Sequence, residues 1–363
     1  MYAKLNTLPA LLALLALGSA AHADDTLQTR VDETIRPLMA EHAIAGMAVA
    51  ITHNGQAHYF NYGVARLDDP QPVSSDTLFE IGSLSKPLTA TLAALAQATG
   101  KLTLADSAGQ HWPELQGSKL EHASLLNLGT YTAGGLPLQF PDNVTDPASM
   151  LAYYRQWQPE HIAGTHRRYS NPSIGLLGML AAKSMGQPFP TLMEGTLFPA
   201  LGMSHSYIQV PTAQLPRYAF GYSKDNQPLR VTPGMLDAEA YGVKTTARDM
   251  LRFVQANLNP AGLNKDLQRA IAMTHTGYYR VGEMTQGLGW ERYPYPISLE
   301  RLQAGNSPAM ALESQPATRL APPESEPSDS LFNKTGSTGG FGAYAVFVPT
   351  RNLGLVMLAN KNY

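Results

Sequence analysis

The chain has 363 residues, no cysteine and a formal net charge of −2 at pH 7. The absence of cysteine excludes disulfides, thiolate metal sites and a cysteine nucleophile. The small net charge gives no indication of nucleic acid or an anionic membrane surface as a partner. A hydrophobic content of 44% is typical of a globular protein and argues against disorder.

The first 23 residues have the three parts of an export signal. Lys4 supplies a positive n-region, residues 8–17 form an apolar h-region, and Ala21-His22-Ala23 is a small-residue cleavage site. The apolar run is too short to span a bilayer as a helix, and no later segment has the length and apolarity that a span requires. We therefore expect cleavage after Ala23, a periplasmic location, and a mature chain of residues 24–363 without a membrane anchor.

Strand-like segments lie near both ends of the mature chain, with helical segments between them. Apolar residues at helical spacing predict an amphipathic helix over residues 26–42. Next, Asn54-Gly55 predicts a hairpin between strands at residues 46–52 and 56–64. The other predicted elements are helices over 83–99, 150–158, 172–184, 190–198 and 247–257, and strands over 342–348 and 353–360. Residues 315–330 are rich in Pro, Ser and Glu and predict a long surface loop.

This order of elements predicts an α/β (α+β) fold. We expect an antiparallel sheet that is built from both termini and flanked by helices, with an inserted, mainly helical lobe. The mature chain then forms one domain. Its sheet lobe covers about residues 24–82 and 225–363, and its helical lobe covers about residues 83–224.

Ser83 and Lys86 open the first helix predicted in the middle of the chain. Positions i and i+3 share a helix face, so the Lys86 amine can reach the Ser83 hydroxyl. The helix N-terminus also offers N–H groups and positive potential to a developing oxyanion. The alternative is that Ser83 only caps the helix. A Ser-x-x-Lys pattern is weak alone, because composition predicts it about once in a chain of this length.

A Tyr-x-Asn pattern occurs twice. Tyr169-Ser170-Asn171 comes just before Pro172 at the mouth of a predicted helix, where the tyrosine can project into a cleft. A nearby ammonium would lower the pKa of that tyrosine by favouring the phenolate. The second copy, Tyr59-Phe60-Asn61, lies in a predicted hairpin strand. We interpret that copy as plain β structure.

Lys334-Thr335-Gly336 precedes a glycine-rich run that ends at Gly342. Glycines there let a strand edge approach a ligand closely. The alternative is a glycine-rich turn with an exposed lysine. A phosphate-binding loop is excluded because its glycines precede the lysine and a helix follows, whereas here the order is reversed and a strand follows. The chain has no Gly-x-Ser-x-Gly elbow and no zinc-binding pattern.

The stretches that contain these motifs together resemble class C β-lactamases of the serine penicillin-recognising superfamily. The resemblance covers essentially the whole mature chain and implies the β-lactamase/transpeptidase-like fold. A tyrosine at the head of the second motif indicates class C, since class A has Ser-Asp-Asn there. The matching stretches are residues 79–86, 131–139, 169–176, 233–237, 240–245 and 334–342.

The resemblance implies roles for the reacting residues. Ser83 would attack a β-lactam carbonyl, and Lys86 and Tyr169 would take its proton, with the choice of base between them left open. Tyr169 would then protonate the leaving nitrogen and later help to activate the deacylating water. The backbone N–H groups of Ser83 and Ser337 would form the oxyanion hole.

The resemblance also implies how a substrate is held. A side-chain amide of the substrate would be bound by two residues, and an aromatic residue would line the pocket beside it. A strand segment would meet the substrate carboxylate and support the catalytic tyrosine. The residues that would bind the amide are Gln139 and Asn171, and the aromatic residue is Tyr241. The strand segment is Lys334, Thr335 and Gly336. No metal and no organic cofactor is implied.

The sequence departs from the family at two places. Pro87 follows Lys86 directly, and proline disfavours helical geometry in the residue before it, so we expect a modest shift of the Lys86 amine. The chain stops at Tyr363, where the family continues with a loop and a C-terminal helix packed on the sheet. We expect an incomplete sequence there rather than a truncated protein.

The leading hypothesis is a periplasmic serine β-lactamase that hydrolyses β-lactam antibiotics, cephalosporins in preference, through an acyl-enzyme. One alternative is a D-alanyl-D-alanine peptidase or a β-lactamase-like esterase, and another is a penicillin-binding receptor that is acylated without turnover. A cleavable signal without an anchor argues against the receptor. We expect a small-molecule β-lactam as the partner, with no nucleic acid and no membrane, and nothing in the sequence demands more than a monomer.

Overall fold

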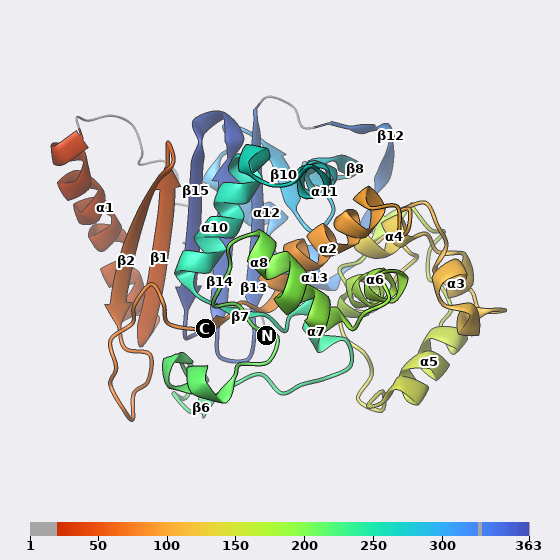
Figure 1. The fold of residues 1–363 in the computed structure, drawn as a ribbon, viewed down its shortest axis with the longest axis horizontal. Coiled ribbons are helices and arrows are strands. Elements are labelled where there is room, and N and C mark those ends of the chain that lie inside the picture. Colours follow the sequence, from red (N-terminus) through yellow and green to blue (C-terminus); the bar gives the residue numbers. More distant parts are fainter. Residues whose placement is uncertain (1–19, 326–328, 363) are drawn as a thin grey trace.

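A nine-stranded antiparallel sheet dominates the protein (Figure 1). The computed structural model describes residues 20–325 and 329–362. The strand order is β12-β8-β9-β10-β13-β14-β15-β1-β2, so the N-terminal strands β1 and β2 form one edge and pair with β15 from the C-terminal end. The strands are β1 Gly46–His53, β2 Gln56–Gly63, β8 Gly277–Val281, β9 Met284–Gln286, β10 Glu291–Pro294, β12 Thr318–Glu324, β13 Ser330–Ser337, β14 Gly342–Val348 and β15 Leu353–Ala359.

The N-terminal hairpin confirms the turn signal in the sequence. Asn54 and Gly55 have φ angles of 50° and 81°, the positive values that a two-residue turn between twisted strands requires. The turn sets the register of β1 against β2, in which His53 pairs with Gln56. On its other edge β1 pairs with β15 of the predicted C-terminal hairpin, so the sheet is built from both termini as predicted.

The prediction of a surface loop over residues 315–330 is wrong for most of this segment, which forms strands. Gln315–Pro316 (β11) pairs with His166–Arg167 (β4) in a small sheet, and β12 pairs with β8 at the edge of the large one. Proline in this segment disfavoured a strand, but an edge strand needs donors on one side only, so it tolerates residues without an N–H group. Two other small sheets pair β3 Phe79–Glu80 with β7 Lys244–Thr245, and β5 Gly221–Tyr222 with β6 Pro228–Leu229.

The helices lie mostly where the sequence predicts them. The first begins at Ala20, earlier than expected, and residues 1–19 of the predicted export signal lie outside the described residues. The helix at Lys265–His275 was not predicted from the sequence. The helices are α1 Ala20–Glu41, α2 Lys86–Ala98, α3 Ala108–His111, α4 Leu125–Gly129, α5 Pro147–Gln156, α6 Asn171–Ser184, α7 Phe189–Leu192, α8 Phe198–Ala200, α9 Asp237–Ala240, α10 Ala247–Leu258, α11 Lys265–His275, α12 Leu299–Gly305 and α13 Pro308–Leu312.

The central helix is α2, which contacts α6 on one side and α11 on another. It is apolar almost all round and buried over nearly its whole length, as such a composition requires. Lys86 is its first residue, so the packing of α2 carries a lysine into the interior. Helix α10 covers β1 and β15, while α3, α5 and α6 gather at the end of the molecule opposite β1 and β2 (Figure 1).

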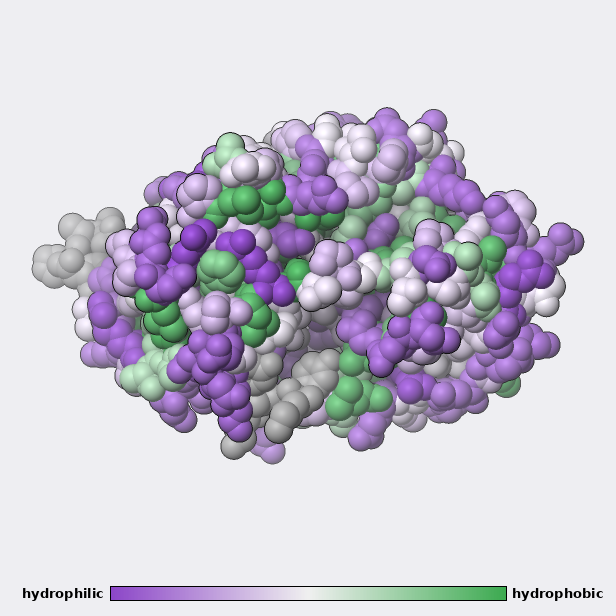
Figure 2. Space-filling view, turned by 90° about the horizontal axis from the view of Figure 1, so that it is seen from below, coloured by the Kyte–Doolittle hydropathy of each residue, from purple (hydrophilic) through white to green (hydrophobic). Residues whose placement is uncertain are grey.

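Polar residues cover much of the molecular surface. On the face seen in Figure 2, hydrophobic residues form separate small groups among them rather than one continuous patch. Across residues 20–325 and 329–362, every helix is too short or too polar to cross a membrane.

Candidate active site

Ser83 and Lys86 lie together at the start of α2. A short 3₁₀ turn, Gly82–Ser85, carries the serine and leads directly into the helix. Lys86 Nζ donates a hydrogen bond of 2.7 Å to Ser83 Oγ and another of 2.9 Å to the Ala240 carbonyl oxygen. The lysine side chain has no exposed surface. The i, i+3 contact predicted from the sequence is therefore present.

Pro87 does not displace the lysine from the serine. Lys86 has φ −62° and ψ −41°, which is helical in spite of the proline that follows it. Pro87 is the second residue of α2, where a backbone N–H would have no partner within the helix, so its missing donor costs little. The Lys86 amine therefore stays within hydrogen-bond distance of Ser83.

Tyr169 reaches the same place from a segment far along the chain, just before α6. The Ser170 hydroxyl accepts a 3.0 Å hydrogen bond from the Ser173 N–H and caps α6, so the tyrosine precedes the helix in an extended segment. Its side chain is 7% exposed. The Tyr169 ring centre lies 5.0 Å from Lys86 Nζ and 4.9 Å from Lys334 Nζ. Among the described residues its hydroxyl has no hydrogen-bond partner of good geometry.

The pKa values of Lys86 and Tyr169 are both lowered to about 8. Burial is the main cause that lowers the pKa of Lys86 to about 8; Tyr169 opposes the change and the charge of Lys334 adds to it. Burial would raise the pKa of Tyr169, but the ammonium groups of Lys334 and Lys86 outweigh burial and bring that pKa down to about 8. Both groups can therefore hold or release a proton close to neutral pH, as an acid–base pair requires.

The third motif lies on β13 against the serine loop. Lys334 is buried, and its Nζ donates a 2.8 Å hydrogen bond to the Thr335 carbonyl oxygen. A Cβ at position 336 would lie 2.0 Å from the Ile81 carbonyl oxygen, so only glycine fits there. Gly82 has φ +50°, and a Cβ there would lie 2.3 Å from the Ser337 carbonyl oxygen. The backbone segments that carry Ser83 and Ser337 are thus in direct contact.

The predicted substrate-binding residues border this cluster. The Asn171 N–H donates a 3.0 Å hydrogen bond to the Leu138 carbonyl oxygen, which places the exposed Gln139 beside it. Asn171 Oδ1 is buried and, among the described residues, has no partner. A buried polar atom of this kind is rare in a core and common in a binding site. Tyr241 is half-buried and directly follows Ala240, whose carbonyl binds Lys86.

Comparisons with known proteins agree with this geometry. The sequence model of the β-lactamase family matches residues 31–363. A β-lactamase of Pseudomonas fluorescens is 58% identical over 333 residues, which are 92% of this chain and 93% of that protein.

The chain belongs to the β-lactamase family.

Solved structures of the family share its fold. A class C β-lactamase in complex with cefoxitin matches with a TM-score of 0.91 and 49% identity, over 94% of this chain and 95% of that one. A β-lactamase/D-alanine carboxypeptidase from Pseudomonas syringae matches with a TM-score of 0.91 and 49% identity, over 92% and 94% of the two chains. The fold class and the class C resemblance predicted from the sequence are confirmed.

Arg167 is a residue of this β-lactamase-family site that sequence reasoning missed. It is buried, and its guanidinium donates to Gln286 Oε1 at 2.7 Å and to Glu291 Oε1 at 3.1 Å. The guanidinium carbon lies 5.3 Å from the Tyr131 ring centre and 5.4 Å from that of Tyr169. In the sequence it is one of two adjacent arginines in a polar segment, and only tertiary contacts distinguish it from Arg168.

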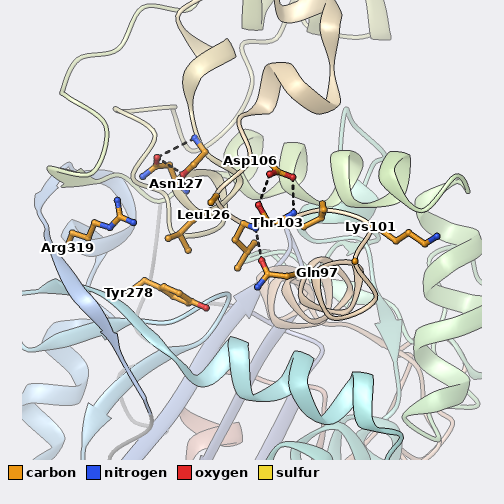
Figure 3. A pocket seen from close by; sticks show the side chains of 13 residues that line it. Gln97, Lys101, Thr103, Asp106, Leu126, Asn127, Tyr278 and Arg319 are labelled. Carbon is orange, nitrogen blue, oxygen red and sulfur yellow. Dashed lines mark hydrogen bonds between the residues drawn. The ribbon is translucent and has the colours of Figure 1, made fainter.

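A groove of about 920 Å³ lies elsewhere, and none of the predicted site residues lines it (Figure 3). Its polar groups are paired locally: Asp106 accepts from Thr103, and the Gln97 side chain accepts from the Leu104 N–H. In the part of the chain that the structure describes, no three histidine, aspartate or glutamate side chains converge as a metal site would need. We therefore place the candidate active site at Ser83 rather than in the groove.

Proposed function

We propose that this protein is a serine β-lactamase of class C, which hydrolyses β-lactam antibiotics, preferably cephalosporins, through an acyl-enzyme on Ser83. The observation that carries the proposal is the 2.7 Å hydrogen bond from Lys86 Nζ to Ser83 Oγ, with Tyr169 against both. The pKa values of Lys86 and Tyr169, each about 8, support a nucleophile activated by a neighbouring base.

Acylation begins when Ser83 Oγ attacks the lactam carbonyl carbon. The hydroxyl proton passes to Lys86 or Tyr169, and the carbonyl oxygen becomes an oxyanion that accepts from the N–H groups of Ser83 and Ser337. The carbon–nitrogen bond of the ring then breaks, and Tyr169 donates a proton to the nitrogen. The products of this half-reaction are a ring-opened ester on Ser83 and a regenerated base.

Deacylation reverses the roles. A water molecule attacks the ester carbonyl and loses a proton to Tyr169, and the same two N–H groups stabilise the second oxyanion. The ester bond breaks, and Ser83 Oγ regains its proton. Lys334 contributes a buried positive charge, and with Thr335 and Gly336 it binds the substrate carboxylate. The same charge favours the phenolate form of Tyr169.

The remaining assignments follow from the same family likeness. Gln139 and Asn171 hold a side-chain amide of the substrate, and Tyr241 lines the pocket beside it. Residues 1–23 direct export to the periplasm, where the protein acts as a monomer. The sheet lobe covers about residues 24–82 and 225–363, and the helical lobe covers about residues 83–224.

A D-alanyl-D-alanine carboxypeptidase is the second candidate function. The relative from Pseudomonas syringae is described as a β-lactamase and a D-alanine carboxypeptidase, and it matches over nearly the whole of both chains. Both reactions acylate a serine and use the same acid–base groups. They differ in the leaving group, because a peptide loses D-alanine while a β-lactam keeps its nitrogen tethered to the acyl group.

The test measures two activities on the purified protein: hydrolysis of a chromogenic cephalosporin and release of D-alanine from a D-alanyl-D-alanine peptide. We expect many turnovers of the cephalosporin and their loss in Ser83→Ala, which removes the nucleophile and little volume. Release of D-alanine without cephalosporin turnover would establish the second candidate instead. Stoichiometric acylation without turnover by the folded protein would contradict both.

A further inference from the structure

Glu80 is a buried carboxylate that joins three segments distant in the sequence. Its side chain is 1% exposed. Oε1 accepts hydrogen bonds from the Tyr218 hydroxyl at 2.6 Å and the Val231 N–H at 2.8 Å. Oε2 accepts from the Thr338 hydroxyl at 2.5 Å. A carboxylate buried with three donors is held in a single position and resists displacement of any of them.

Two of these segments carry the oxyanion-hole donors. Glu80 lies three residues before Ser83, and Thr338 directly follows Ser337. Gly82 and Gly336 let the two backbones touch, but contact alone does not fix a distance. Within the described residues no backbone hydrogen bond joins residues 80–84 to residues 336–338, and the bond from Thr338 to Glu80 is their direct polar link.

We propose that Glu80 is a positioning residue that fixes the separation of the Ser83 and Ser337 N–H groups by holding Thr338. The proposal rests on the proposed function, in which both groups stabilise the oxyanion. Such donors act at about 2.7–3.1 Å from the oxyanion. A misplacement of about 1 Å can cost on the order of a hundredfold in rate, so a link between the two segments affects catalysis without touching the substrate.

The third segment, which carries Tyr218 and Val231, binds the other oxygen of the carboxylate. Burial, together with the charge of Glu80, raises the pKa of Tyr218 far above its usual value, so its hydroxyl stays a donor. The guanidinium carbon of Arg230 lies 3.8 Å from the Tyr218 ring centre and holds this ring in place. With Oε1 occupied by Tyr218 and Val231, Oε2 remains directed at Thr338.

The test removes only the link to Thr338. Thr338→Val keeps the β-branched shape and deletes the hydroxyl, and Thr338→Ser keeps the hydroxyl. The matched control is Thr52→Val in β1, because the buried Thr52 hydroxyl accepts a 3.1 Å hydrogen bond from Gln255 Nε2 of α10 and has no role in the proposed mechanism. Each variant is assayed for kcat and KM with a cephalosporin, for affinity to phenylboronic acid, and for thermal stability.

A positioning role has a signature that a purely structural role lacks. A boronic acid adds to a serine hydroxyl as a tetrahedral anion, so its affinity reports the oxyanion hole directly. We expect Thr338→Val to lose about tenfold in kcat/KM and about tenfold in boronate affinity with little change in KM. We expect Thr338→Ser to recover most of both losses and Thr52→Val to lose thermal stability alone.

Two different results would contradict the positioning role of Glu80 and the proposed function, respectively. If the unmodified protein turns over cephalosporin and Thr338→Val matches Thr52→Val in both kcat/KM and boronate affinity, Glu80 does not position the oxyanion hole. If the unmodified protein neither turns over a cephalosporin nor is acylated at Ser83, the proposed function fails, and this inference fails with it.

Discussion

The two Tyr-x-Asn segments have the same sequence pattern and opposite environments. Tyr59 lies in β2, where Phe60 and Tyr62 point into the core and Asn61 is exposed. Tyr169 lies in an extended segment before α6, where Ser170 caps the helix and Asn171 is buried beside it. Residues i and i+2 of a strand share a face, so Tyr59 and Asn61 both lie on the more exposed face of β2, whereas Tyr169 and Asn171 are both buried.

A nearby cation is not what distinguishes the two tyrosines. The Arg248 guanidinium lies 5.0 Å from the Tyr59 ring centre, but Arg248 pairs with Asp76 at 2.8 Å near the surface. Lys86 and Lys334 are both buried beside Tyr169, and within the described part of the chain neither forms an ion pair with a carboxylate. Uncompensated, desolvated charge therefore distinguishes the copy that we propose to be catalytic, because the field of such a charge on a neighbour is poorly screened.

Replacing each tyrosine by phenylalanine gives the largest expected contrast. Tyr169→Phe removes the hydroxyl that protonates the leaving nitrogen, so kcat/KM should fall by about 10² to 10⁴-fold. Tyr59→Phe should stay within about twofold of the unmodified protein. Steady-state kinetics with one cephalosporin measure both. A loss of this size in kcat/KM for Tyr59→Phe, or no loss for Tyr169→Phe, would show that the wrong tyrosine has been assigned to the site.

Removing the charge of Lys334 should move the pH profile. Lys334 lowers the pKa values of both Lys86 and Tyr169, which are about 8, so its loss raises both. In Lys334→Gln we therefore expect the acidic limb of kcat/KM to shift to higher pH, whichever group is the base, with about tenfold less activity at pH 7 per pKa unit. Lys265→Gln, at an exposed position of α11, is the control. An unmoved limb would remove Lys334 from the proton path.

The smallest expected effect is on stability. Burial raises the pKa of Glu239 to about 7, above its ordinary value of 4.5, so the folded state binds this proton more tightly than the unfolded state. The stability that this tighter proton binding contributes is fully present below pH 4.5 and is lost as the pH rises through 7. Glu239→Gln should therefore gain unfolding free energy relative to the unmodified protein between pH 5 and pH 8, up to about 3 kcal/mol.

Denaturant unfolding at both pH values measures this gain. The control is Glu33→Gln, at an exposed position of α1 on the side of the molecule that carries Tyr59. It should give the same small difference at both pH values. A pH-independent effect of Glu239→Gln would mean that its carboxyl does not titrate in this range.

Local chemistry predicted much of the fold and the residues that the structure brings together at the candidate site. Asn54-Gly55 favours its hairpin because both residues readily adopt the positive φ angles that the two-residue turn requires. Ser83 and Lys86 are three residues apart, so a helical turn is enough to join them. The motifs at Tyr169 and Lys334 were identified by order and context, which their family also shares.

What the sequence did not predict depends on contacts between distant segments. Arg167 and Glu80 look like ordinary charged residues, and only burial against partners far along the chain shows what they do. Strand β12 was missed because its prolines oppose a strand everywhere except at a sheet edge, and edge position is a property of the whole sheet.

The most direct test of the central claim is a rapid-quench time course of the protein with a cephalosporin, followed by intact mass and peptide mapping. We predict a covalent adduct on the peptide that contains Ser83, formed and lost at rates that account for steady-state turnover, and no adduct in Ser83→Ala. Turnover without an adduct on Ser83, or an adduct on another residue, would contradict the account.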